Sequence, residues 1–292
     1  MNSLKPSQTE FIDIRGLRYC VRHWGKPTAP KVFLLHGWMD SSASFQFIAD
    51  ALQQEWHLIA PDWRGYGQSE YLHKAYWFPD YYADLDALLH HYTPNESVRL
   101  VGHSMGANIA SIYAGTKPQR VKQIAMLDFL GLNRTSPTDA AKQLDKWLDN
   151  QSGGHKLRTY EDATALARRL RQSNSRLSAE RADFLSQNVS RIRADGLVEM
   201  ACDPWHKIPS PSLYKIEDVM NFWRSITCPV QMLIADDGFV FERFGTDSDE
   251  YKERISCFNE LQVVRITDAG HNIQHDQPEQ VATALERFLS RN

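Results

Sequence analysis

The pentapeptide Gly102-His103-Ser104-Met105-Gly106 limits most strongly how this chain can fold. It directly follows the apolar run at residues 98–101 and directly precedes a segment rich in alanine. A turn this tight between a strand and a helix places its central serine in strained backbone angles, and glycines two positions away on either side remove side chains that would clash. The sequence therefore predicts a strand, a sharp turn and a helix, with Ser104 at the tip of the turn.

Short apolar runs without alternation recur through the first half of the chain. Each is bounded by Gly, Pro or Asp, which is typical of parallel strands covered by helices on both faces. The runs lie at residues 32–35, 58–60, 98–101 and 124–127, and amphipathic helix patterns lie between them at 45–52 and, after Pro79, at 85–92. Such alternation predicts βαβ units with right-handed crossovers. An N-terminal hairpin is expected at 11–14 and 17–22, around Arg15-Gly16.

The alternation of predicted strands and helices stops after Asp128 and resumes late in the chain. Residues 133–224 are rich in charged residues and glutamine, with amphipathic helix patterns at 140–148, 162–170 and 179–185, whereas residues 229–235 and 261–266 again read as strands before a closing helix after Pro278. The last strands would have no sheet to join unless they complete the first one. We therefore expect a core of residues 1–132 and 225–292, with residues 133–224 as a helical cap over the carboxyl edge of the sheet, where ligands bind in open α/β folds. An independent second domain is the alternative.

Composition excludes several classes of function. Apolar residues make up 42% and charged residues 24% of the chain, and the net charge is -3, so there is no basic footprint for nucleic acid. No apolar segment approaches the length of a membrane span, and the N-terminus lacks the features of a signal peptide, so we expect no membrane insertion and a cytoplasmic location. The four cysteines lack the paired spacing of a zinc site and are expected to be reduced.

A serine hydroxyl is a weak nucleophile near neutral pH, and it needs an imidazole to accept its proton and a carboxylate to orient that imidazole. His271 follows the strand-like run at 261–266, in the segment Asp268-Ala269-Gly270-His271-Asn272. An acid between Ser104 and His271 would give the order serine, acid, histidine, which is one of the chain orders known for such triads. We predict that Ser104 is the nucleophile and His271 the general base.

The acid has three candidates at the ends of strands. Asp236 and Asp237 follow the run at 230–235, and Asp128 ends the run at 124–127. We favour Asp237, because the loop after the penultimate strand is the commoner position of the acid, although the turn there is a residue shorter than usual. Asp128 and Asp236 remain alternates, and the other role open to Asp128 is to anchor the first loop of the cap through backbone hydrogen bonds.

Backbone N–H groups are expected to stabilise the negative oxygen of a tetrahedral intermediate. One donor should come from Met105, directly after the nucleophile, and the other from Trp38, in the turn that follows the run at 32–35. Three neighbours, His36, Gly37 and His103, are predicted to contact substrate.

Together these segments resemble the α/β-hydrolase superfamily along nearly the whole chain. The motifs that carry the resemblance are His36-Gly37-Trp38, Asp62-Trp63-Arg64-Gly65-Tyr66-Gly67-Gln68-Ser69, Gly102-His103-Ser104-Met105-Gly106 and Gly270-His271. The resemblance implies a mostly parallel eight-stranded sheet, a structural turn at residues 62–69 and a packing or salt-bridge role for Arg64. The sharp turn at residues 102–106 corresponds to the nucleophile elbow of this superfamily. A serine at its tip argues against haloalkane dehalogenases and epoxide hydrolases, which resemble this layout but use an aspartate there.

A narrower set of motifs is similar to the serine hydrolase-like branch, which has a helical cap. This set comprises His36-Gly37-Trp38-Met39-Asp40, Leu127-Asp128-Phe129-Leu130-Gly131 and Asp203-Pro204-Trp205. The similarity implies a hydrolase and makes Asp128 a stronger candidate for the acid.

The resulting hypothesis is a hydrolase that acts on a small ester, thioester or related acyl compound through an acyl-enzyme on Ser104. No cofactor is required, and the protein is expected to be a monomer or homodimer. A metal site at His271, His275 and Asp276 is disfavoured, because their spacing falls in a loop without an identifiable further ligand. The alternatives are a binding protein that keeps the fold without the chemistry, and a carbon–carbon bond hydrolase or cofactor-free enzyme that uses the same residues.

Overall fold

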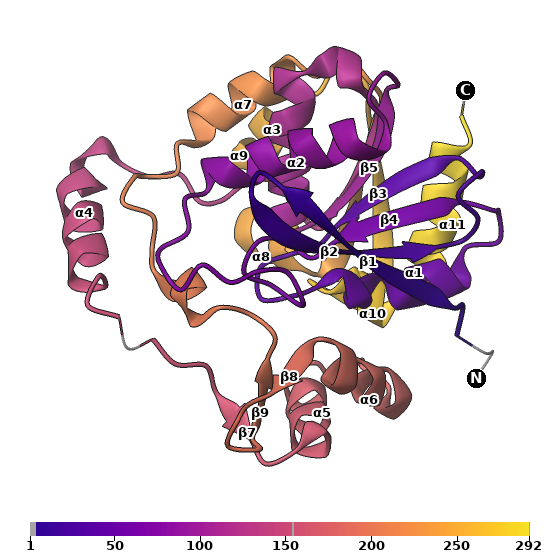
Figure 1. Ribbon diagram of the computed structural model, residues 1–292. Coiled ribbons are helices and arrows are strands. Elements are labelled where there is room, and N and C mark those ends of the chain that lie inside the picture. The colour runs from indigo at the N-terminus through magenta and orange to yellow at the C-terminus, as the bar shows by residue number, and fades with distance from the viewer. Residues whose placement is uncertain (1–3, 154, 292) are drawn as a thin grey trace.

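The computed structural model describes residues 4–153 and 155–291, and its centre is a twisted sheet with helices on both faces (Figure 1). The sheet has eight strands in the order β1-β2-β4-β3-β5-β6-β10-β11. These strands are β1 (Ser7–Ile14), β2 (Leu17–Trp24), β3 (Lys31–Leu35), β4 (His57–Pro61), β5 (Val98–His103), β6 (Val121–Leu127), β10 (Val230–Asp237) and β11 (Leu261–Gly270). β1 and β2 form the expected antiparallel hairpin, and β2 is antiparallel to β4, whereas the other pairings are parallel. The predicted mostly parallel eight-stranded sheet is confirmed.

The strands place alternate side chains on two separate hydrophobic layers. In β3, Phe33 and Leu35 pack on one layer, while Val32 and Leu34 pack on the other. The first layer is covered by α2 (Pro79–Tyr92), α3 (Met105–Thr116), α7 (Ile216–Arg224), α8 (Phe239–Phe244) and α9 (Asp249–Ile255). The second is covered by α1 (Gln46–Ala51), α10 (Ile273–Asp276) and α11 (Pro278–Leu289). Burial on both faces explains why the apolar runs in the sequence do not alternate with polar residues.

Helix α3 begins in close contact with the strands beside it. A Cβ added at Gly106 would lie 2.0 Å from the carbonyl oxygen of Leu35, and one added at Gly102 would lie 2.5 Å from the backbone nitrogen of Ala107. Ser104, between them, has φ 51° and ψ -114°. The predicted strained turn is confirmed, and the two glycines are required because backbone fills the space that a side chain would need.

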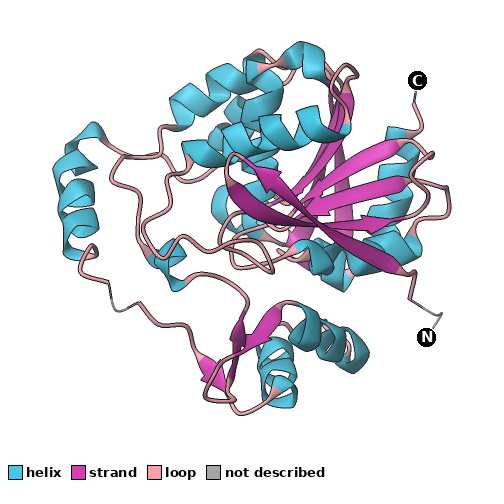
Figure 2. Cartoon of the chain, in the orientation of Figure 1, coloured by secondary structure: helices cyan, strands magenta, loops and turns pink. Residues whose placement is uncertain are grey.

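The segment inserted between β6 and β10 contains strands as well as helices (Figure 2). After η3 (Pro137–Asp139) and α4 (Ala140–Asp149), a small antiparallel sheet in the order β7-β9-β8 packs with α5 (Ala163–Ser173) and α6 (Ala179–Asn188). Its strands are β7 (Thr159–Tyr160), β8 (Ser190–Ile192) and β9 (Val198–Met200). The three expected helices are present, and the small sheet is an addition that the sequence patterns did not predict.

The expected end of the insertion at residue 224 also needs correction. α7 packs against α3, and the fully buried Trp223 donates a hydrogen bond from its indole N–H to Ser111 Oγ at 3.1 Å. Ile216, Val219 and Met220 belong to the same hydrophobic layer. α7 is therefore part of the core layer, because its apolar face is buried by α3 rather than by the rest of the insertion.

The returning chain of the insertion is tied to the turn at residues 62–69. Tyr66 and Cys202 form an isolated antiparallel bridge, and the N–H of Asp203 donates to the carbonyl of Gly65 at 2.7 Å. Within this turn Arg64 forms ion pairs with Asp80 and with the fully buried Asp84. The structural role expected for this turn and for Arg64 agrees with these contacts.

The structure bears on two further expectations. The four cysteines are unpaired and buried. Within the described residues, no helix has the length and apolar character needed to cross a membrane.

The contact between α3 and β3 predicts a large effect of Gly106→Ala. The added methyl group would collide with backbone at Leu35, so the substitution should lower the free energy of unfolding by about 3 kcal/mol. Gly270→Ala is the matched control, because its added Cβ would meet no neighbour closer than 3.5 Å. Chemical denaturation of both variants checks the prediction, and equal stability of the two would contradict it.

Candidate active site

Ser104 lies between the end of β5 and the start of α3, at the carboxyl edge of the sheet. Its backbone N–H donates to the carbonyl of Leu127, at the end of the neighbouring strand β6, at 3.2 Å. The side chain lines a cavity between the core and the insertion. The strained turn therefore presents the Ser104 hydroxyl to that cavity.

His271 follows β11 and contacts Ser104 directly. The ring Nε2 lies 2.9 Å from Ser104 Oγ, and Nδ1 lies 2.8 Å from Oδ2 of Asp128. With the proton on Nδ1, the ring donates to the carboxylate and accepts a hydrogen bond from the serine hydroxyl. This is the arrangement that a general base needs to take the hydroxyl proton.

Asp128, directly after β6, is completely buried. Besides His271, its carboxylate accepts hydrogen bonds from the backbone N–H of Phe239 at 2.6 Å and of Ala235 at 3.3 Å. The backbone has φ 48°, so the side chain leaves the sheet at an unusual angle. These donors compensate for the burial of a charged carboxylate and fix its position beside the imidazole.

The structure does not place Asp237, the acid favoured by the sequence, beside His271. Strand β10 continues through Asp237, which pairs with Gly270 in β11. The exposed Asp237 carboxylate instead forms an ion pair with Arg176 of the insertion, and that of Asp236 pairs with Arg265. The preference for Asp237 is therefore corrected to the alternate Asp128, because β10 continues through Asp237 and both of its acids pair with arginines instead of His271.

His36, predicted to contact substrate, is buried away from the cavity. Its Nδ1 lies 2.8 Å from the carbonyl oxygen of Gly37, and its Nε2 accepts a hydrogen bond from the N–H of Trp63 at 2.9 Å. Burial lowers the pKa of His36 to about 4. The imidazole is neutral and joins two loops, so the predicted substrate contact was wrong.

His103 does line the cavity, but both ring nitrogens already have partners. Nε2 lies 2.9 Å from the carbonyl oxygen of His271, and Nδ1 lies 3.3 Å from the amide nitrogen of Gln274. Burial, together with the neighbouring His271, holds the pKa of His103 well below its usual value. The ring therefore fixes the backbone of His271 in addition to forming part of the cavity wall.

The two predicted N–H donors, those of Met105 and Trp38, belong to chain segments that lie next to Ser104. Met105 is the first residue of α3, where an N–H has no partner within the helix. The loop that carries Trp38 comes close to the elbow, since a Cβ added at Gly37 would lie 3.2 Å from Ser104 Cβ and 2.9 Å from His103 Nδ1. Gly37 itself makes this approach possible rather than contacting the cavity, and the half-exposed indole of Trp38 lies at the cavity wall.

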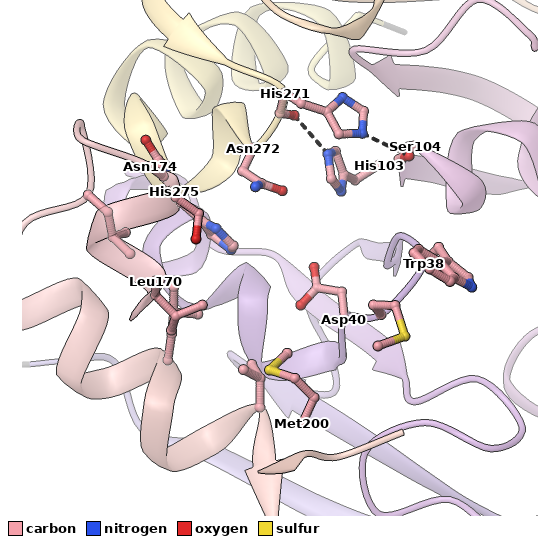
Figure 3. A pocket seen from close by; sticks show the side chains of 15 residues that line it. Trp38, Asp40, His103, Ser104, Leu170, Asn174, Met200, His271, Asn272 and His275 are labelled. Atoms are coloured by element: carbon pink, nitrogen blue, oxygen red, sulfur yellow. Dashed lines mark hydrogen bonds between the residues drawn. The ribbon is translucent and has the colours of Figure 1, made fainter. Parts of the chain in front are cut away.

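The cavity has a volume of about 230 Å³ and one apolar and one polar side (Figure 3). The insertion contributes most of the apolar wall, namely Leu170, Leu177, Leu185, Val189 and Met200. The polar wall contains Asp40, Asn174, Asn272 and His275 in addition to His103, Ser104 and His271. The insertion thus forms one wall of the cavity that Ser104 lines.

The insertion contacts the core through polar groups next to the site. Arg176 forms ion pairs with Asp237 and, at 3.1 Å, with Asp268. Arg181 donates to the carbonyl of His275 at 2.9 Å, and Asn174 donates to Asp276 at 2.6 Å. These contacts join the insertion to the C-terminal parts of β10 and β11 and to α10, and His271 lies between β11 and α10.

His275, considered in the metal alternative, has a different partner. Its Nε2 lies 2.6 Å from Ser44 Oγ, and Asp276 accepts hydrogen bonds from Asn174 and from the N–H of Gly270. Among the described residues, no group of three or more histidine, cysteine, aspartate or glutamate side chains has the arrangement of a metal site.

Sequence reasoning missed the polar wall around Asp40, Ser44 and His275. Asp40 stands three residues after Gly37 and Ser44 four residues after Asp40, so both belong to the loop and helix that follow β3. Position in a loop at the carboxyl edge of the sheet is a signal that could have identified Asp40. The contact between Ser44 and His275, 231 residues apart, could not have been found from local patterns.

Comparison with known proteins agrees with this architecture. A family described as "alpha/beta hydrolase fold" matches residues 30–278. A serine hydrolase-like protein of Danio rerio is 28% identical over 278 residues, which are 91% of this chain and 83% of the relative. A serine hydrolase-like protein of Dictyostelium discoideum is 28% identical over 229 residues, which are 75% of this chain and 63% of the relative.

Among solved structures, the thioesterase domain from the curacin biosynthetic pathway superimposes with a TM-score of 0.84. The two share 24% sequence identity, and the match covers 97% of this chain and 99% of that domain. This likeness shows that the two share a fold over nearly their whole lengths.

The contacts of Asp128 predict that Asp128→Ala destabilises the protein. The substitution leaves the buried N–H of Phe239 without its acceptor, and we expect the free energy of unfolding to fall by about 3 kcal/mol. Asp237→Ala removes only a largely exposed ion pair and should cost less than about 1 kcal/mol. Urea denaturation of both variants measures the difference, and a larger loss for Asp237→Ala would contradict the assignment of Asp128.

Proposed function

The chain belongs to the α/β hydrolase fold family, and on that basis we propose that it is a serine hydrolase that cleaves a small ester or thioester through an acyl-enzyme on Ser104. The observation that carries the proposal is the hydrogen-bonded series Ser104, His271 and Asp128, with distances of 2.9 and 2.8 Å. Family membership and the similarity to serine hydrolase-like proteins support a hydrolase, and the site geometry supports the finer assignment.

In the proposed reaction, Ser104 Oγ attacks the substrate carbonyl carbon while its proton moves to Nε2 of His271. Asp128 stabilises the resulting imidazolium and keeps the ring in the correct orientation. The backbone N–H groups of Met105 and Trp38 donate to the negative oxygen of the tetrahedral intermediate.

Collapse of the intermediate breaks the bond to the alcohol or thiol, which leaves with the proton from His271. Water then gives a proton to His271 and attacks the acyl carbon, and the second intermediate releases the acid and restores Ser104. The dimensions of the cavity, about 230 Å³, support a small substrate. We assign the role of lid to the inserted segment before α7, because this segment supplies the apolar wall of the cavity.

Reaction with a fluorophosphonate tests whether Ser104 is activated. We expect the purified protein to form one adduct, located at Ser104 by peptide mass spectrometry, because His271 accepts the hydroxyl proton during attack. Ser104→Ala should fold and remain unlabelled. A folded wild-type protein that does not react would favour the alternative of a binding protein that has kept the fold alone.

Substitution of the acids tests the role of Asp128 in turnover. We expect Asp128→Asn to reduce kcat by roughly 10³- to 10⁴-fold, since an asparagine cannot hold the imidazole in the same tautomer or stabilise its charge. Asp237→Asn is the matched control and should retain kcat within about threefold, because its carboxylate is bound to Arg176 and away from His271. Hydrolysis of short p-nitrophenyl esters provides the measurement, and a greater loss for Asp237→Asn would contradict the mechanism.

A further inference from the structure

Asp40 contributes a carboxylate to the cavity wall from the loop after β3. Figure 3 shows this side chain extending into the cavity from the core side, opposite Leu170 and near His275. One oxygen, Oδ1, accepts hydrogen bonds from the N–H of Ser41 at 2.8 Å and from the hydroxyl of Ser44 at 2.6 Å. These bonds hold the carboxylate in place.

The second oxygen, Oδ2, has no hydrogen-bond donor among the described residues. The neighbouring hydrogen bonds do not involve Oδ2, because Ser44 Oγ donates to Oδ1 and accepts from Nε2 of His275 at 2.6 Å. Ser44 and His275 are themselves buried. Oδ2 is therefore a fixed acceptor that faces the cavity and is available to a ligand.

Asp40 is also the only Asp, Glu, Lys or Arg among the described residues that line the cavity. Burial lowers the pKa of His275 to about 3 and holds that of His103 well below its usual value, so both rings are neutral. Burial raises the pKa of Asp40 to about 6, with the negative charge of Asp62 adding to the effect. Near neutral pH and above, the cavity thus contains one carboxylate that lacks a compensating cation.

We propose that Asp40 is a specificity-determining residue that binds a protonated amino group of the substrate through Oδ2. An ammonium group supplies both the missing hydrogen-bond donor and the missing positive charge, whereas a neutral hydroxyl supplies only the donor. A substrate carboxylate would be repelled at the same position. The substrate class is therefore a small ester or thioester with an amino group on the part that occupies the cavity.

The inference rests on the proposed hydrolase function, but substrate binding can be measured separately from turnover. Ser104→Ala removes the nucleophile and allows the equilibrium affinity for intact esters to be determined by calorimetry or NMR titration. β-Alanine ethyl ester and ethyl butanoate form one isosteric pair, with the ammonium group on the acyl side. Dimethylaminoethyl acetate and isoamyl acetate form a second pair, with the ammonium group on the alcohol side.

In the Ser104→Ala background, we expect the charged ester of at least one pair to bind roughly tenfold or more tightly than its neutral isostere. Adding Asp40→Asn keeps an oxygen for Ser41 and Ser44 but replaces the free acceptor, and the ratio of affinities should fall to about one. Adding Asp145→Asn is the matched control: it removes one negative charge from the exposed face of α4, outside the cavity, and should leave the ratio unchanged.

Equal affinities within both pairs, or a ratio that Asp40→Asn does not alter, would overturn the inference. Monoethyl succinate binding as tightly as β-alanine ethyl ester would also overturn it. Turnover of the same esters by the wild-type protein separates the two proposals. Hydrolysis without a charge preference retains the hydrolase and removes the role of Asp40, whereas a charge preference in binding without hydrolysis or labelling of Ser104 retains Asp40 as a binding residue and removes the hydrolase.

Discussion

The close approach of helix α3 to strands β3 and β5 is the constraint on which the site depends. Backbone atoms fill the positions where Gly102 and Gly106 would carry side chains, and Ser104 accepts a positive φ between them. The same geometry leaves the first N–H groups of α3 beside Ser104 and brings the end of β6 within hydrogen-bond reach of the elbow. The chain therefore accepts local strain in order to present one hydroxyl, and burial around α3 offsets that cost.

Much of the fold could be predicted because its signals are local. Apolar runs buried on both faces of the sheet identify β3, β5 and β6, and the flanks of the pentapeptide identify the elbow. Ser104 and His271 could be placed near each other because both follow strands of one parallel sheet, whose carboxyl ends share an edge. The distance of 2.9 Å between Ser104 Oγ and His271 Nε2 also depends on the conformations of the two loops, which the topology does not determine.

The remaining features depend on contacts between distant parts of the chain. Chain order admits Asp128 and Asp237 equally, and only the continuation of β10 and its pairing with β11 separates them. Similarly, the amphipathic pattern of α7 does not determine which surface buries its apolar face. In the structure that surface is α3. The role proposed for the free oxygen of Asp40 likewise depends on distant contacts, because the insertion supplies the opposite wall of the cavity and Ser44 binds the other oxygen.

The central claim is that Ser104 carries the acyl group during turnover. The most direct measurement is peptide mass spectrometry of protein quenched during the first turnovers of p-nitrophenyl acetate, with His271→Ala as control. We expect one acetyl group on the peptide containing Ser104, appearing with the burst of p-nitrophenol and disappearing as substrate is exhausted, and no such species in the control. Steady release of p-nitrophenol with no acetyl group on Ser104, or with the acetyl group on another residue, would contradict the account.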